Sequence, residues 1–223
     1  MSSAYFAIPT ELNSEPLLLK VCGMRDKDNI QELIHLKPDW LGLIFYPKSA
    51  RFVEKVLAAD DVKKIPPTVK KVGVFVNEDF ETIREKIDTY NLDAVQLHGE
   101  ESPDLCRRLT AADVTVIKAF SVDDAFNFAK LAPYEGACDY YLFDTKGQQY
   151  GGNGTTFNWE ILANYTGQTP FFLSGGLDLE HAAVIKNLNL PLLKGLDINS
   201  RFELSPGRKD INKVKSFIEK IRS

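Results

Sequence analysis

The sequence predicts an α/β fold, a (β/α)8 TIM barrel that forms a single domain. Apolar runs of strand length alternate with stretches of helical period from Leu17 to the end of the 223-residue chain. Runs such as 71–76 and 170–173 are too uniformly apolar for a sheet with one wet face, as is typical of parallel strands covered by helices. An open doubly wound sheet is the alternative, because periodicity does not distinguish a closed barrel from an open sheet.

Eight strand–helix units fit into residues 17–223, after an N-terminal extension over residues 1–16. Each unit then has about 26 residues, enough for a strand, a helix and two short loops. The predicted strands are residues 17–22, 40–46, 71–76, 93–97, 115–120, 140–144, 171–174 and 193–198. The predicted helices are residues 28–36, 53–61, 79–90, 103–109, 123–131, 158–164, 179–188 and 210–222.

Polar residues mark several helix starts. Asp79, Ser102 and Ser121 each precede a predicted helix and can accept a hydrogen bond from a backbone N–H of its first turn. The last predicted helix begins at Asp210 and ends near Arg222, so its charged ends match the helix dipole. These signals place the helices between the apolar strands.

Composition and charge favour a small-molecule function. The chain has 27 Lys and Arg residues against 31 Asp and Glu, which gives a formal net charge of -4. It therefore lacks the basic field that attracts nucleic acid or an anionic membrane surface. No apolar run in the sequence approaches the length of a membrane span.

The cysteines favour a cytoplasmic protein. Cys22, Cys106 and Cys138 are an odd set without a CxxC pair, which argues against a disulfide framework and against a zinc site. Residues 1–16 lack the basic start and the continuous apolar core of a signal peptide. We therefore expect a cytoplasmic location.

Reactive side chains follow the predicted strands. Cys22 ends the first strand and Asp144 ends the sixth. In a barrel, the carboxyl ends of the strands lie on one rim, so a thiol and a carboxyl can face each other across a substrate there. That pairing suggests a base and an acid.

A phosphate site is predicted after the last two strands. Ser174, Gly175 and Gly176 follow the seventh strand, and Asn199 and Ser200 follow the eighth. Adjacent glycines let backbone amides approach an anion closely, and these two loops are the usual phosphate position in such barrels. Because a Gly-Gly pair alone is more often a simple turn, the prediction depends on both loops.

Ordered motifs cover nearly the whole chain after residue 16. They are KVCGM at 20–24, GLIFYPKSAR at 42–51, VGVFVN at 72–77, VQLHG at 95–99, FDT at 143–145, GGNG at 151–154, LSGGL at 173–177 and GLDI at 195–198. Each motif is modest, but in this order they are specific. Together they resemble the phosphoribosylanthranilate isomerase family of tryptophan biosynthesis.

The resemblance implies an Amadori rearrangement without cofactor or metal. N-(5-phosphoribosyl)anthranilate becomes 1-(o-carboxyphenylamino)-1-deoxyribulose 5-phosphate: an acid protonates the furanose oxygen as the ring opens, and a base then removes the C2 proton. By resemblance, Asp144 is the acid and Cys22 the base. A carboxyl ordinarily has a pKa of about 3.9, so an acid of this kind requires burial or nearby negative charge. A thiol, at about 8.5, is closer to neutrality.

The same resemblance suggests how a phosphorylated small-molecule substrate is bound. Arg51 is the best candidate for the anthranilate carboxylate, because its planar fork matches a carboxylate, and Lys48 is the alternative partner. His98 is either a substrate contact or a hydrogen-bonded core residue. Asp197 contacts the ribulose hydroxyls or only braces the rim. The oligomeric state stays open between monomer and homodimer.

Both reactive residues have a structural alternative. Cys22 could be a small core filler, which is how we interpret Cys106 and Cys138. Asp144 could cap a turn through Thr145.

The loop after the eighth strand departs from the family pattern. Arg201 and Phe202 follow Ser200, where the family usually has a small residue and glycine, which puts in doubt a phosphate held mainly by backbone amides. We expect the Arg201 guanidinium to reach the phosphate; the alternative is a side chain in solvent. A milder change is Asn153, where threonine is common in the glycine loop.

Two other functions fit parts of the same pattern. A related isomerase of the histidine pathway uses two aspartates, and Cys22 at the end of the first strand disfavours it. The non-enzymatic alternative is a barrel that binds a phosphorylated ligand as a sensor, with Cys22 as a redox switch.

Overall fold

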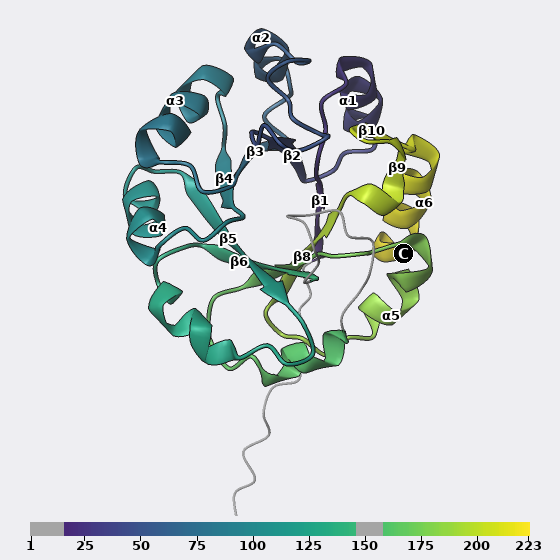
Figure 1. Cartoon of the computed structure of the whole chain (residues 1–223). Helices are drawn as coiled ribbons and strands as arrows, with labels where there is room; N and C mark the ends of the chain where they lie inside the picture. Colours follow the sequence, from purple (N-terminus) through teal and green to yellow (C-terminus); the bar gives the residue numbers. More distant parts are fainter. Residues whose placement is uncertain (1–15, 146–157) are drawn as a thin grey trace, which may run out of the picture.

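In the computed structural model, which describes residues 16–145 and 158–223, eight parallel strands close into a barrel in sequence order (Figure 1). The first strand pairs with the second and also with the eighth, which closes the ring. The strands are β1 (Leu18–Val21), β2 (Trp40–Ile44), β3 (Lys70–Phe75), β4 (Ala94–Leu97), β5 (Thr115–Val122), β6 (Tyr140–Thr145), β7 (Phe171–Leu173) and β8 (Leu193–Ile198). The closed ring confirms the predicted barrel and rules out the open doubly wound sheet.

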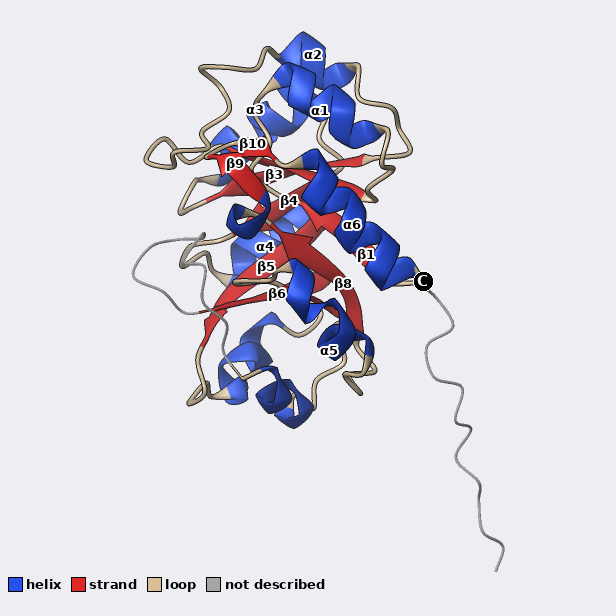
Figure 2. Ribbon diagram, turned by 90° about the vertical axis from the view of Figure 1, so that its right-hand side faces the viewer, coloured by secondary structure: helices blue, strands red, loops and turns tan. Residues whose placement is uncertain are grey.

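The helices lie outside the ring of strands (Figures 1 and 2). The α-helices are α1 (Lys27–Ile34), α2 (Ala59–Lys63), α3 (Phe80–Tyr90), α4 (Pro103–Thr110), α5 (Ala182–Lys186) and α6 (Ile211–Arg222). The 3-10 helices are η1 (Phe128–Tyr134), η2 (Trp159–Asn164), η3 (Leu179–His181) and η4 (Ser200–Phe202). Among the described helices, none is long and apolar enough to cross a membrane. The predicted extension, apart from Pro16, and the glycine loop with Asn153 lie outside the described residues.

The barrel interior is filled by side chains that alternate along the strands. Trp40 is the largest, and its ring lies 5.3 Å from that of Phe172 and 5.8 Å from that of Tyr140. The sequence neighbour Leu41 points the other way, into the larger core between strands and helices. Since the interior is a packed core, a ligand is expected at the rim. The inner cluster is Trp40, Val72, Ala94, Ile117, Ala119, Leu142 and Phe172.

Three of the predicted helix starts are confirmed. Asp79 accepts a hydrogen bond from the N–H of Thr82 at 2.7 Å, and Ser102 and Asp210 cap α4 and α6 in the same way. The prediction for Ser121 is wrong, because β5 continues through it to Val122.

Several predicted helices differ from the structure for local reasons. Residues 53–57 are not helical: the N–H of Val53 donates to the carbonyl of Ile44 at 3.0 Å, which fixes this segment to the end of β2, and the helix starts only at Ala59. The predicted helix 123–131 is the later 3-10 helix η1, which contains Pro133, a residue without an N–H to donate. The predicted helix 158–164 is also a 3-10 helix, and 179–188 is divided into η3 and α5.

A short hairpin after η4 was not predicted. Its strands are β9 (Glu203–Ser205) and β10 (Arg208–Lys209). Asn29 of α1 fixes it to the barrel: its Oδ1 accepts from the N–H of Lys209 at 2.6 Å, and its Nδ2 donates to the carbonyl of Lys209 at 3.0 Å. The hairpin therefore has a fixed position beside α1.

Candidate active site

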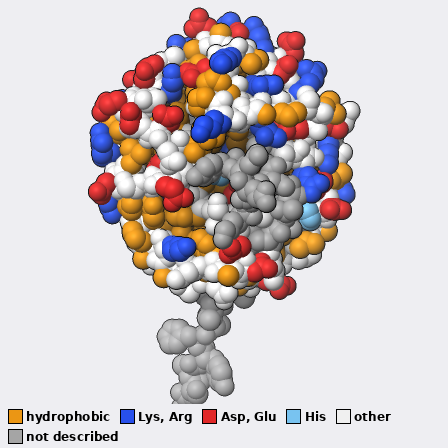
Figure 3. Space-filling model, viewed as in Figure 1, with side chains coloured by type: hydrophobic (Ala, Val, Ile, Leu, Met, Phe, Trp, Pro, Cys, Tyr) orange, Lys and Arg blue, Asp and Glu red, His pale blue; other side chains and the backbone are white. Residues whose placement is uncertain are grey.

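A cavity at the carboxyl ends of the strands collects most of the predicted site residues. Over the face of the molecule seen in Figure 3, acidic and basic side chains are interspersed around this end. The predicted residues that line the cavity are Cys22, His98, Asp144, Gly175, Gly176, Asp197, Asn199 and Ser200, and Arg201 lines it as well.

The two proposed catalytic residues approach this cavity from opposite parts of the chain. Cys22 directly follows β1, where its N–H donates to the carbonyl of Ile198 at 2.9 Å, and Asp144 lies near the end of β6. Only 4% of Cys22 and 7% of Asp144 is exposed. The structure thus brings the thiol and the carboxyl to one cavity, as predicted.

The Cys22 thiol is buried beside charged groups. Burial raises its pKa above the ordinary value, and the nearby lysines Lys20 and Lys209 oppose that shift. At neutral pH most of the thiol is therefore protonated. Burial also raises the pKa of Cys106 to about 11 and of Cys138 to about 12, as expected for core fillers away from the cavity.

A buried ion pair lies below Cys22 and was not predicted. Lys20 of β1 faces Asp197 in the register of β8, and its Nζ donates to Asp197 Oδ1 at 2.9 Å. Burial disfavours the charge on Lys20, but Asp197 and Cys22 outweigh it and raise the lysine pKa. Asp197 thus pairs with Lys20 and also lines the cavity, and a lysine inside an otherwise apolar strand was the available sequence signal.

His98 contacts the proposed acid. Its Nε2 lies 3.2 Å from Asp144 Oδ2, and Gln96 Nε2 lies 2.8 Å from its Nδ1. Because the Gln96 amide donates to Nδ1, the imidazole carries its proton on Nε2 and donates it toward Asp144. His98 lines the cavity beside Asp144, and its contact with a substrate stays a prediction.

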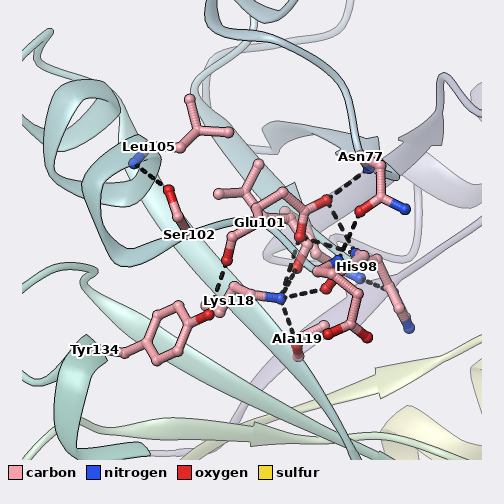
Figure 4. Close-up of polar contacts among 12 residues, drawn as sticks. Asn77, His98, Glu101, Ser102, Leu105, Lys118, Ala119 and Tyr134 are labelled. Carbon is pink, nitrogen blue, oxygen red and sulfur yellow. Dashed lines mark hydrogen bonds and ion pairs between the residues drawn. The ribbon is translucent and has the colours of Figure 1, made fainter.

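The loop that carries His98 is anchored by a second buried ion pair (Figure 4). Lys118 of β5 donates to the carbonyls of Gly99 at 2.8 Å and Ala119 at 2.9 Å, and its Nζ lies 3.1 Å from Glu101 Oε2. Glu101 in turn accepts from the N–H groups of Gly99 and Asn77. These contacts fix the backbone on both sides of the loop and so set the position of His98.

Arg51 lies beside Cys22 and is already engaged. Its Nε and Nη2 donate to the carboxylate of Glu203 of β9, the closest contact being 2.6 Å. Arg51 is thus not a solvated loop residue, whereas Lys48, the alternative partner for the carboxylate, is exposed. Gly23 makes room for the Arg51 side chain, because a Cβ at Gly23 would lie 2.6 Å from the Cδ of Arg51. The φ of Gly23, +76°, also favours glycine at this position.

The two predicted phosphate loops lie side by side at the cavity. Gly175 has a φ of +87° and packs so closely on Thr145 that a Cβ would clash with the Thr145 hydroxyl. The side chain of Asn199 is occupied, because its Oδ1 accepts from Lys209 Nζ at 2.8 Å. Arg201 lies in η4, a conformation that any side chain adopts, and it lines the same cavity as Gly176.

In the described part of the chain, no group of three or more His, Cys, Asp or Glu residues is arranged to hold a metal ion.

Comparisons with known proteins point to one family. The family model described as N-(5'phosphoribosyl)anthranilate (PRA) isomerase matches residues 19–220. N-(5'-phosphoribosyl)anthranilate isomerase of Parabacteroides distasonis is 48% identical over 208 residues, with 92% of this chain and 93% of the relative covered. The enzyme of the same name from Phocaeicola vulgatus is 42% identical over 206 residues, with 92% and 98% covered.

Solved structures show the same likeness. Phosphoribosyl anthranilate isomerase of Thermotoga maritima has a TM-score of 0.80 and 35% identity, over 92% of this chain and 98% of that chain. A second structure, with a TM-score of 0.79, 32% identity and the same coverage, is a phosphoribosyl anthranilate isomerase in complex with reduced 1-(o-carboxyphenylamino)-1-deoxyribulose 5-phosphate.

Proposed function

Because the chain belongs to the N-(5'-phosphoribosyl)anthranilate isomerase family, it is an isomerase of tryptophan biosynthesis, and we propose that Cys22 and Asp144 carry its acid–base chemistry. The observation that supports these roles is the shared cavity, which a thiol at the end of β1 and a carboxyl at the end of β6 both line. The substrate is a phosphorylated small molecule.

The proposed reaction has two proton transfers. Asp144 donates a proton to the furanose oxygen as the C1–O bond breaks and the nitrogen lone pair forms an iminium. His98 occupies Oδ2 of the carboxyl, so Oδ1 carries the proton that is transferred. The Cys22 thiolate then removes the C2 proton and gives an enolamine, which tautomerises to the product.

Lys20 supports the base in this scheme. Burial alone would keep Cys22 protonated, and the Lys20 ammonium is the strongest of the groups that lower the thiol pKa. Asp197 holds Lys20 in place at 2.9 Å. We therefore assign Lys20 the task of keeping a usable fraction of thiolate in a buried site, against burial and against the Asp197 carboxylate, whose charge raises the thiol pKa.

The activity is tested with freshly made N-(5'-phosphoribosyl)anthranilate. Adding the purified protein should extinguish the fluorescence of this substrate as the product forms. Loss of fluorescence also separates the isomerase from a histidine-pathway enzyme and from a sensor, neither of which consumes this substrate. A protein that leaves the fluorescence unchanged would contradict the function.

Replacing Arg51 with lysine should weaken substrate capture more than it slows the bound substrate. A point charge cannot reproduce the planar fork, so we expect a loss of about 1.5 to 3 kcal/mol in kcat/KM, with most of it in KM. Steady-state kinetics on the fluorescent substrate measure both constants. An unchanged kcat/KM would remove Arg51 from the carboxylate site and leave Lys48 as the next candidate.

We propose that the substrate phosphate binds between the loops after β7 and β8. Gly175 and Gly176 offer backbone amides, and Ser200 and Arg201 line the same cavity. Because the family's glycine is replaced here, we assign part of the phosphate binding to the Arg201 guanidinium.

Arg201→Ala should therefore weaken the binding of a phosphorylated ligand and of inorganic phosphate in parallel. Titration calorimetry at low and at high salt measures both, and added salt should narrow the gap between variant and parent, because an exposed guanidinium is screened. Arg208→Ala, which removes another exposed arginine that pairs with Asp26, is the matched control. If phosphate affinity at low salt is the same in both proteins, Arg201 is a surface residue and the backbone amides suffice.

Location and assembly are part of the proposal. Cys22, Cys106 and Cys138 are free thiols, which supports a cytoplasmic location, where thiols stay reduced.

A Thermotoga maritima relative is described as dimeric, and for this chain we propose a monomer or a homodimer. Light scattering on the purified protein distinguishes the two.

A further inference from the structure

We propose that Glu203 is a positioning residue which, supported by Lys209, turns one edge of the Arg51 guanidinium toward the substrate and makes the site selective for a carboxylate. The proposal rests on the role of Arg51 as the carboxylate-binding residue. It gives a task to the hairpin of β9 and β10, which neither the acid nor the base requires.

The geometry of the Arg51 fork carries the argument. Nε lies 2.9 Å and 3.1 Å from the two carboxylate oxygens of Glu203, and Nη2 lies 2.6 Å from Oε2. A guanidinium has five N–H donors in one plane, so Glu203 takes the edge formed by Nε and Nη2. The edge formed by Nη1 and Nη2 has no other partner within the described part of the chain. That edge can donate two parallel hydrogen bonds to a second carboxylate.

The surrounding charges leave room for a second anion. Lys209 Nζ lies 2.6 Å from Glu203 Oε1, so two basic side chains share a single carboxylate. Burial disfavours the charge on Glu203, but Arg51 and Lys209 outweigh it and lower the pKa of Glu203. Glu203 is therefore ionised at neutral pH, and a ligand carboxylate would complete the pairing of the two basic groups.

The backbone holds Glu203 in place. Asn29, which is buried in α1, bonds both the N–H and the carbonyl of Lys209. The N–H of Gly207 donates to Glu203 Oε1 at 3.1 Å. Figure 1 shows β9 and β10 beside α1 at this side of the barrel. Glu203 therefore acts as a fixed point from which Arg51 is aimed.

The position of the Arg51 fork matches the reaction. Gly23, which directly follows Cys22, lies against both Arg51 and Asn199. A Cβ built at Gly23 would lie 2.6 Å from the Arg51 Cδ and 2.7 Å from Asn199 Oδ1. A carboxylate bound by Arg51 would thus hold the aromatic end of the substrate next to the base. The alternative is that Glu203 only attaches the hairpin to the barrel, and the two hypotheses differ in what they predict for ligands without a carboxyl.

The experiment compares two inhibitors in titration calorimetry. The first is reduced 1-(o-carboxyphenylamino)-1-deoxyribulose 5-phosphate, and the second is the same molecule without the carboxyl group. Glu203→Gln should cut the preference for the first inhibitor by about tenfold or more, the size of one charge-assisted hydrogen bond, and should leave the affinity for the second unchanged. In kinetics, the same variant should raise KM and leave kcat close to the parent value.

A double-mutant cycle separates positioning from a structural role. In an Arg51→Met background, Glu203→Gln should have no further effect on the preference, because the group it positions is gone. Glu54→Gln, which breaks a contact of 2.6 Å to Lys86 outside the cavity, is the matched control. Glu203→Asp keeps the carboxylate but moves it one methylene further from Arg51. This variant should retain part of the preference for the carboxylate inhibitor, and it tests the proposal even if Glu203→Gln folds poorly.

Four outcomes would overturn the proposal. If Glu203→Gln weakens both inhibitors equally, or if its effect on the preference persists in the Arg51→Met background, Glu203 only attaches the hairpin to the barrel. Tighter binding of the carboxylate by Glu203→Gln would mean that its charge opposes the ligand. If Arg51→Met alone leaves the preference intact, the carboxylate role of Arg51 is wrong, which is a separate result from a failure of Glu203 alone.

Discussion

Asp144→Asn is expected to lower kcat by about 10²- to 10⁴-fold, the range in which general acid catalysis contributes. The amide preserves the shape of the side chain and can still accept the hydrogen bond from His98, but it cannot supply the proton to the furanose oxygen. Affinity for the product should stay within about tenfold, because the cavity is unchanged. Turnover is measured by substrate fluorescence and affinity by product titration.

The control for this variant is an aspartate outside the cavity. Asp61→Asn removes a carboxylate of α2 that pairs with Lys27 at 2.9 Å, and it should keep the turnover of the parent. If Asp144→Asn also turns over like the parent, Asp144 is not the acid. His98, which lies 3.2 Å from it, would then be the next proton donor to examine.

The strands could be predicted because their signal is local. A barrel strand is buried on both faces, so runs such as residues 71–76 are continuous in the sequence, and β3 at Lys70–Phe75 lies one residue from that prediction. The helices were predicted less well where a local feature overrides the period. The N–H of Val53 is bonded to the end of β2, and Pro133 lies in the 3-10 helix η1. The spacing of hydrophobic residues reveals neither the hydrogen bond nor the 3-10 geometry.

The candidate site could be predicted in part, for a related reason. Residues at the ends of strands share one rim whatever the details of the fold, so Cys22 and Asp144 could be placed together in advance. Ion pairs depend on register and on distant loops, which local patterns do not contain. Lys20 meets Asp197 only because β1 closes against β8, and Arg51 meets Glu203 across a separation of 152 residues.

Cys22→Ser should also lower kcat by about 10²- to 10⁴-fold, because a serine hydroxyl is far too weak an acid to provide the base near neutral pH. The variant is nearly isosteric, so binding of the product should change little. Burial raises the pKa of the Cys22 thiol above its ordinary value, so the active thiolate is a minor species at neutral pH. Its fraction, and with it kcat/KM, should rise about tenfold per pH unit below that pKa.

The pH profile therefore tests the base more sharply than the rate alone. In the parent, kcat/KM should climb through neutral pH and level off only above the ordinary thiol value, since the shift is upward. The serine variant should lose that rise and keep only the changes that come from other groups. Cys106→Ser, which alters a buried thiol away from the cavity, is the control and should retain the profile of the parent. If Cys22→Ser keeps most of its turnover, or keeps the alkaline rise, the base is another residue and Cys22 only fills space against Gly42.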